Sequence, residues 1–197
     1  PNAQLALLTF SSNVKKARDF DNKGFDNVNY PTPNGQTNLG AAIQKADEML
    51  AEKKKSDANA KLYMVILSDG YPEGQTVNHT KAANDAKNVT GVEIFTIGYD
   101  TDEGTQELLQ GVATDKNHYS NADGNNVAQK FTDIAGSIET SVPAGRNATI
   151  TDTIADGFSY VEGSGNNATV DGKKISFNLD EITEEGETVS FKIKIDK

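Results

Sequence analysis

Apolar and polar residues follow two different periods along the first two-thirds of the chain, one typical of strands and one typical of helices. Short apolar runs predict strands at 4–10, 62–67 and 92–99, and a weaker alternation of apolar and polar residues predicts another at 14–20. A period of three to four residues predicts helices between and after these strands, at about 37–55, 78–88, 105–113 and 126–140. Strands and helices that alternate in this order predict an α/β fold with a doubly wound, mostly parallel sheet and helices on both faces.

The segment 62–70 carries the most informative pattern. Its apolar run ends directly at Ser68-Asp69-Gly70, and such a run, bounded by turn residues, predicts a strand buried on both faces of a parallel sheet. Open α/β sheets bind their ligands at the carboxyl ends of the strands. Asp69 is therefore placed to hold a cation or a polar ligand. The alternative is that Asp69-Gly70 only forms a turn.

The pattern changes near Pro143, where the helical period ends. Beyond it, strands are predicted at 148–154, 158–161, 175–179 and 188–195. Asp171-Gly172 predicts a hairpin turn before the third of these strands. We therefore expect two domains, an α/β domain at 1–141 and a small all-β unit at 142–197. The second is short for a complete sandwich.

Composition narrows the function. The 197 residues include no cysteine, which excludes a disulfide scaffold, zinc–thiolate sites and thiol catalysis. The net charge of −10 argues against nucleic acid as a partner. No apolar run reaches the roughly 20 residues of a membrane span, and no signal-peptide pattern opens the chain. Because Pro1 leads almost directly into a strand, we expect a fragment of a longer protein.

Four segments resemble, in order, successive elements of a von Willebrand factor type A domain: LALLTFS at 5–11, GQTNLGAAI at 35–43, VILSDG at 65–70 and VEIFTIG at 92–98. The resemblance covers about 1–140. It implies a metal-ion-dependent adhesion site (MIDAS) on top of the sheet, built in the family from Asp-x-Ser-x-Ser after the first strand, a later threonine, and an aspartate after the fourth strand. Thr37 matches the threonine and Asp69 matches the last aspartate.

The Asp-x-Ser-x-Ser segment has no counterpart in this chain. It should precede Leu5 together with the first strand and helix, whereas Ser11-Ser12 follows a later strand and lacks the leading aspartate. Mg²⁺ or Mn²⁺, the implied cofactor, requires about six oxygen ligands, of which Thr37 and Asp69 supply two. The sequence therefore predicts half a site. It also predicts an exposed apolar sheet edge, which would lead to aggregation or would accept a second polypeptide.

The tail is similar to β-sandwich modules of Gram-positive surface proteins and pilins, in the segments ATITDTI at 148–154, GFSYV at 157–161, ISFNL at 175–179 and GETVSFKI at 186–193. The resemblance implies a small Ig-like sandwich, in which a Lys–Asn isopeptide bond assisted by an acid can form. Asp152 and Asn178 are of the right types, but no lysine stands out as their partner. The alternative is that both are ordinary strand residues.

The remaining polar candidates indicate no catalytic centre. His79 and His118 have no second histidine or carboxylate at ligand spacing, and we expect both on the surface or in loops. Ser68 lacks the Gly-x-Ser-x-Gly context of a nucleophile. The acids Asp100, Asp102 and Glu103 either contact a cation or cap the next helix. The chain is therefore not expected to be an enzyme.

Together the two resemblances imply a pilus-tip or cell-wall adhesin, extracellular and on the surface of a Gram-positive bacterium. Its expected partners are a host or extracellular-matrix protein that presents an acidic residue to the divalent cation, and other pilus or cell-wall subunits. An intracellular scaffold domain in an ATPase- or chelatase-type assembly is the alternative, which leaves the β tail unexplained. A hydrolase that uses Asp69 lacks a base, a nucleophile and a phosphate loop.

Overall fold

The chain forms two compact units, and each is described here by itself. The computed structural model describes residues 3–23, 28, 32, 34–141, 145–182 and 186–196. The units are Pro1–Ala135 and Gly136–Lys197. The division falls within helix α4, Val127–Ser141, a few residues before the expected boundary at 141/142.

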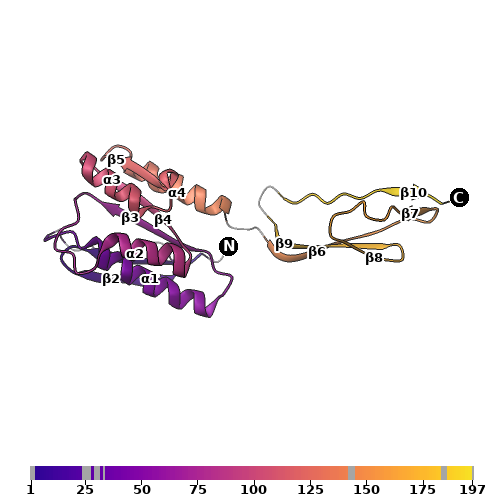
Figure 1. Cartoon of the computed structure of the whole chain (residues 1–197), viewed down its shortest axis with the longest axis horizontal. Helices are drawn as coiled ribbons and strands as arrows, with labels where there is room; N and C mark the ends of the chain where they lie inside the picture. The colour runs from indigo at the N-terminus through magenta and orange to yellow at the C-terminus, as the bar shows by residue number, and fades with distance from the viewer. Residues whose placement is uncertain are drawn as a thin grey trace. The chain divides into compact units, whose positions relative to one another are not determined.

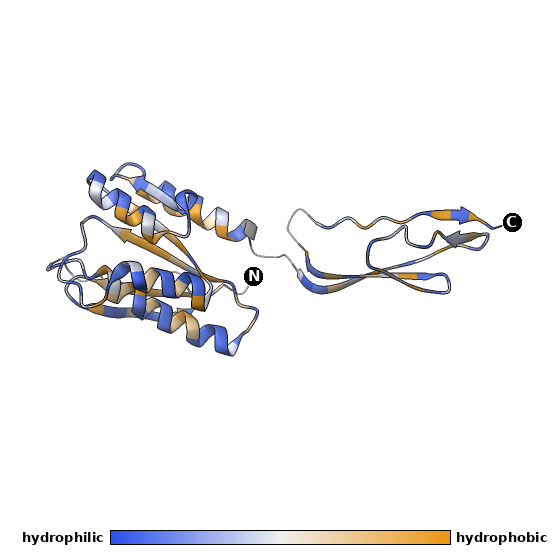
Figure 2. Ribbon diagram, in the orientation of Figure 1, coloured by the Kyte–Doolittle hydropathy of each residue, from blue (hydrophilic) through white to orange (hydrophobic). Residues whose placement is uncertain are grey.

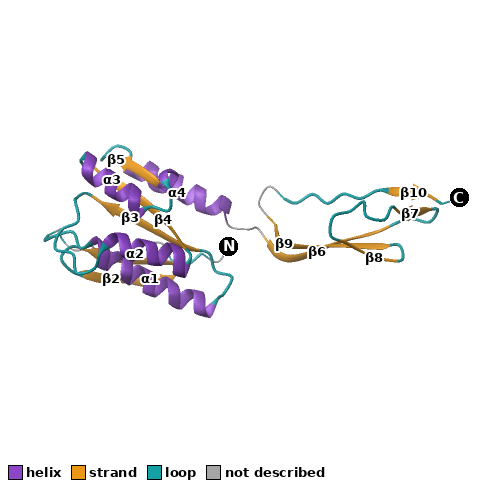
Figure 3. Cartoon of the chain, in the orientation of Figure 1, coloured by secondary structure: helices purple, strands orange, loops and turns teal. Residues whose placement is uncertain are grey.

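The first unit alternates strands and helices as the sequence predicted (Figures 1 and 3). Its elements before α4 are β1 Leu5–Phe10, β2 Val14–Asp21, α1 Leu39–Ser56, β3 Leu62–Ser68, α2 His79–Asp85, the π-helical η1 Ala86–Thr90, β4 Val92–Tyr99, α3 Glu103–Val112, the 3-10 turn η2 Lys116–His118 and β5 Tyr119–Ala122. No helix in the described part of the chain is long and apolar enough to cross a membrane.

The strands of this unit form a mixed arrangement. β3, β4 and β5 make a parallel sheet in that order, while β1 and β2 pair antiparallel. Among the described residues, no ladder joins β1 to β3. The predicted parallel sheet is confirmed for three strands, and the hairpin of β1 and β2 adds an antiparallel pair beside it.

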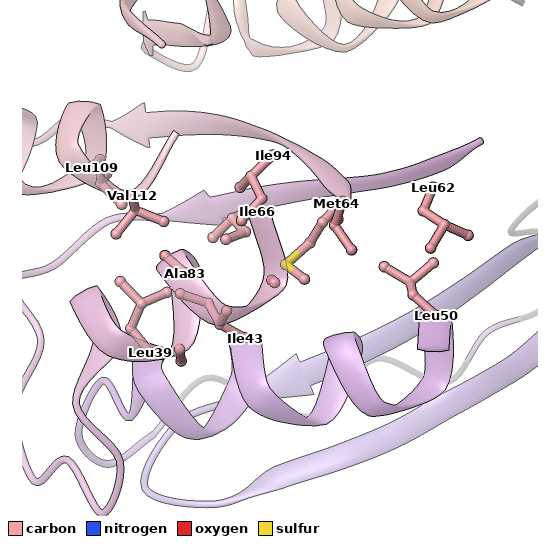
Figure 4. Close-up of a cluster of buried hydrophobic side chains, with 13 residues drawn as sticks. Leu39, Ile43, Leu50, Leu62, Met64, Ile66, Ala83, Ile94, Leu109 and Val112 are labelled. Atoms are coloured by element: carbon pink, nitrogen blue, oxygen red, sulfur yellow. The ribbon is translucent and has the colours of Figure 1, made fainter. Parts of the chain in front are cut away.

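One face of β3 packs against α1. Leu39, Ile43 and Leu50 of the helix meet Met64 and other apolar side chains of the strand in a buried cluster (Figure 4). The apolar residues of β3 and β4 form the most hydrophobic ribbon of the unit, whereas the helices carry polar residues on their outer faces (Figure 2). Burial of this apolar surface is the main force that holds α1 on the sheet.

The prediction that β3 is buried on both faces is wrong. Its residues alternate between buried and accessible, and Val65 and Leu67 are 38% and 40% exposed. The neighbouring β4 is buried on both faces, with Ile94 and Ile97 inaccessible. The difference arises because none of the described elements packs over the second face of β3.

After the last residues of α4, the second unit consists of strands, namely β6 Gly145–Thr153, β7 Phe158–Tyr160, β8 Ala168–Asp171, β9 Lys174–Ile182 and β10 Ile193–Ile195. β9 lies between β6 and β8, and β7 pairs with β10, all antiparallel. A buried cluster of Ile154, Ile175 and Phe177 forms its core, against which Phe191 packs. The expected hairpin at Asp171-Gly172 joins β8 to β9.

The last strand is shorter than the predicted 188–195. Before β10, Lys192 donates its backbone N–H to Ser164 Oγ and accepts the backbone N–H of Val161. These partners belong to the turn after β7 rather than to a strand. Regular pairing therefore begins only at Ile193.

Candidate functional site

Three loops meet at the carboxyl end of β3, and Asn38 joins them. Its side chain donates to Ser12 O at 3.3 Å and to Thr76 Oγ1 at 3.1 Å, and its Oδ1 accepts from Thr76 N at 3.2 Å. Its own backbone N–H donates to Ser11 O at 2.9 Å. Asn38 is the N-cap residue of α1 but makes no side-chain cap bond, and its buried amide links the loop after β1 to the loop after β3.

These links bring Thr37 beside the Asp69-Gly70 turn. Thr37 O accepts from Glu73 N at 3.1 Å, and a Cβ atom added to Gly70 would lie 3.4 Å from Thr37 Oγ1. The loops that carry the two predicted ligands therefore lie against each other, although more than 30 residues separate Thr37 from Asp69 in sequence. Asp69 is exposed, and neither its carboxylate nor the Thr37 hydroxyl has a hydrogen-bond partner among the described residues.

The loop after β3 is also fixed to the first turn of α1. Gly40 N donates to Gln75 Oε1 at 2.9 Å. A Cβ on Gly40 would lie 1.9 Å from Val77 O, which only a glycine permits. The close approach holds the first turn of α1 against residues 75–77 of the loop after β3.

The described oxygens fit part of a divalent-cation site. Thr37 offers a hydroxyl and Asp69 a carboxylate, both of the hard oxygen type that Mg²⁺ and Mn²⁺ take. The described residues contain no group of three or more histidines and acids that could hold a metal. The two side chains thus supply a minority of the about six ligands that Mg²⁺ requires, and waters or groups from elsewhere must supply the rest.

The other polar candidates near this end of the sheet have structural partners. Ser12 Oγ accepts from Gln36 N at 3.0 Å, so it holds the loop before α1. Asp102 is the N-cap of α3, and its Oδ1 accepts from Thr105 N at 2.8 Å. That backbone hydrogen bond lowers the pKa of Asp102. Of the two alternatives for this acidic group, helix capping is confirmed at Asp102.

Asp152 and Asn178 lie on opposite faces of the sheet formed by β6, β9 and β8. Asp152 pairs with Ile175, so it shares the face of that core residue, whereas Asn178 comes three residues later on β9. Thr149 Oγ1 donates to Asn178 Oδ1 at 3.0 Å on the outer face. The register therefore does not bring together the two residues named for an isopeptide bond.

The prediction that both histidines are isolated is wrong for His118. One ring nitrogen lies 2.8 Å from Asp115 Oδ1 and the other 2.7 Å from Glu93 Oε1. The sequence showed Asp115 three residues before His118 but gave no sign of Glu93, which parallel pairing of β4 and β5 brings near. Among the residues that the structure describes, the ring of His79 has the neutral Gln75 side chain as its hydrogen-bond partner, at 2.7 Å.

Comparison with known proteins agrees with this fold. The sequence model of the von Willebrand factor type A domain matches residues 1–134, and the chain therefore belongs to that family. No curated protein sequence matches the chain.

Two solved structures are similar in fold. One is the vWF domain of the type V pili tip protein Mfa5 from Porphyromonas gingivalis, with 16% sequence identity and a TM-score of 0.52 over 74% of this chain and 82% of that one. The other is the conserved hypothetical protein BatB from Bacteroides thetaiotaomicron, with 16% identity and a TM-score of 0.52 over 70% of this chain and 80% of that one. At these identities the likeness concerns the fold alone.

Proposed function

We propose that this chain is an adhesion module of a bacterial surface protein, which binds an acidic residue of a partner protein with the help of Mg²⁺ or Mn²⁺ at the carboxyl end of β3. The observation that carries the proposal is the position of the Thr37 hydroxyl beside the Asp69-Gly70 turn, with neither side-chain oxygen engaged. The proposed place in a bacterial surface protein is supported by the similar fold of a domain from a pilus-tip protein. The proposed location is extracellular, on a pilus or Gram-positive cell wall, and no enzymatic activity is proposed.

Charge explains why a cation is part of the proposal. The chain has a net charge of −10, and Glu73 lies exposed in the same loop as Asp69, so an acidic partner would be repelled. A bound divalent cation supplies positive charge to which a partner's carboxylate can bind. Asp69 provides the negative charge that attracts the cation, and Thr37 provides a neutral oxygen that leaves part of the positive charge uncompensated. The proposed partners are a host or matrix protein and other pilus or cell-wall subunits.

Calorimetric titration with Mn²⁺ tests the proposal on the full chain. We expect saturable one-site binding, weakened at least about tenfold in Asp69→Asn, because the only carboxylate of the described pair loses its charge. Glu73→Gln is the matched control, since it removes one negative charge from the same loop without touching either ligand. Equal weakening in both variants would show that Mn²⁺ senses net charge rather than the site, and an absence of saturable binding would also contradict the proposal.

The alternative is an intracellular scaffold domain in an ATPase- or chelatase-type assembly. This alternative is supported by the similarity in fold to BatB, which has the same TM-score and sequence identity as the similarity to the pilus-tip protein. The β-strands of the second unit favour adhesion, because a scaffold role leaves the β tail unexplained. Binding of a partner that is insensitive to chelation of divalent cations and to Asp69→Asn would favour the scaffold.

A further inference from the structure

The opposite, amino end of the parallel sheet contains a histidine held between two carboxylates. His118 is the last residue of η2 and directly precedes β5, Glu93 is the second residue of β4, and Asp115 precedes η2. The two ring nitrogens of His118 lie within hydrogen-bond distance of one carboxylate each, and the side chain is only 16% exposed. None of these three residues belongs to the proposed cation site.

The surrounding backbone fixes this arrangement independently of the proton. Asp115 Oδ1 also accepts from Asn117 N at 2.7 Å, and Asp115 O accepts from His118 N at 3.1 Å. Thr114 binds β4 twice, donating its N–H to Ile94 O and accepting the Ile94 N–H at Oγ1. The ring of Phe95 packs against the imidazole, with centroids 4.5 Å apart. The imidazole therefore has little freedom to turn away when it loses a proton.

Both contacts together require the doubly protonated ring. A neutral imidazole carries one N–H and can donate to only one of the two carboxylates, while the imidazolium donates to both. Burial by itself would lower the pKa of His118, but the hydrogen bonds to Asp115 and Glu93 outweigh it, so the pKa lies above its ordinary value. The nearby cation of η1, Lys87, lines the same surface hollow as Glu93 and donates to the carbonyls of Gly111 and Ala113.

We propose that His118, Glu93 and Asp115 form a proton-dependent clamp that fastens the start of β5 to β4. The clamp is closed while the imidazole carries both protons, and it loses one of its two links when the ring becomes neutral. The vacated carboxylate then faces a ring nitrogen lone pair, which is a repulsive contact. The proposal does not rest on the adhesion function.

The sign of the effect follows from linkage. Because the folded-state pKa of His118 lies above the unfolded value of about 6.5, the clamp contributes fully to stability below that pH. The contribution is lost as the pH rises through the folded-state pKa. The carboxyl of Asp115 has the opposite pH dependence. Its pKa is lowered, first of all by the hydrogen bond with His118, so its contribution to stability is lost only in strong acid. The contribution of the clamp to the stability of the first unit should therefore be greatest in mildly acidic solution.

A titration of the two histidines by NMR tests the clamp, because the chain supplies its own control. His79 and His118 are the only histidines, and burial lowers the pKa of His79. As the pH is raised, we expect His79 to lose its proton first and His118 clearly later. In Glu93→Gln the transition of His118 should move down toward that of His79, while His79 itself stays unchanged. Joint titration of the two rings, or an unmoved His118 in Glu93→Gln, would overturn the proposal.

Thermal melting provides the second measurement. His118→Gln should lower the Tm by about 3 °C near pH 5.5 and by less near pH 8.5, because only the protonated wild-type ring closes both links. His79→Gln is the matched control, and its loss in Tm should not be greater near pH 5.5 than near pH 8.5. A loss in His118→Gln that is equal at both pH values would indicate simple packing and contradict the clamp. If His118→Gln does not fold, Glu93→Gln replaces it in the same comparison.

Discussion

β3 and β4 are neighbours in one parallel sheet and are both mostly apolar, yet they are buried differently. β4 is covered on both faces, while among the described elements β3 is covered only on the face toward α1 and its packed cluster, which leaves Val65 and Leu67 accessible. An apolar run shows that a strand can be buried. Whether it is buried on one face or on both depends on the elements that pack against it. Two mostly apolar strands of one sheet therefore contribute differently to the stability of the fold.

The strand edges show the same contrast. β2 carries five charged residues among its eight, which is how natural proteins protect a free edge from pairing with another chain. β1 and β3 carry none, and each has one hydrogen-bonded neighbour among the described strands. Their sequences are therefore those of interior strands.

The largest effect should come from a residue buried in β4. Ile94→Ala is expected to lower the free energy of unfolding by about 3 kcal/mol, because it leaves a cavity between fully packed side chains. Val65→Ala on β3 removes a partly exposed side chain and should cost less than about 1 kcal/mol. Urea unfolding of both variants measures the difference. Similar losses would mean that the open face of β3 is covered in solution, which would remove the contrast between the strands.

The sequence predicted the elements of the fold better than their environment. Periodicity placed β3, β4 and the helices within a few residues, because each local pattern agreed with its tertiary role. Periodicity could not predict the open face of β3, since exposure depends on neighbours distant in sequence. The shortened β10 was missed for a similar reason, because Lys192 forms its backbone hydrogen bonds with a turn.

For the candidate site, the residues were predictable only in part. Thr37 and Asp69 came from a family resemblance, and the structure brings their loops together. Asn38 has no sequence signature, because an asparagine before a helix is first interpreted as an N-cap. Glu93 likewise looks like an ordinary polar residue on a strand until the pairing of β4 and β5 places it near His118.

A middle-sized effect is expected at Asn38, which connects the loop after β1 with the loop after β3. Asn38→Ala removes the side-chain partner of Thr76 N and of Ser12 O, and it leaves a gap where the buried amide of Asn38 lies. We expect a loss of about 2 kcal/mol in unfolding free energy, measured in urea, and weaker binding of Mn²⁺ because Thr37 is no longer held in place. Asn34→Ala, in the exposed part of the same loop, is the control and should be close to neutral. An Asn38→Ala variant as stable as this control would show that the two loops are joined by other means.

The smallest effect on stability, but a diagnostic one, is expected at the open face of β3. An accessible apolar face beside an uncharged strand edge favours association, and Leu67→Lys places a charge on it. Because Leu67 is already 40% exposed, the change in unfolding free energy should be within about 1 kcal/mol. Sedimentation velocity should show association that grows with concentration for the unsubstituted chain and is reduced in the variant. Val89→Lys is the control, since it places the same charge at an exposed apolar residue outside the sheet. If both substitutions reduced association equally, net charge rather than the face of β3 would govern it, and the contrast between β3 and β4 would have no consequence in solution.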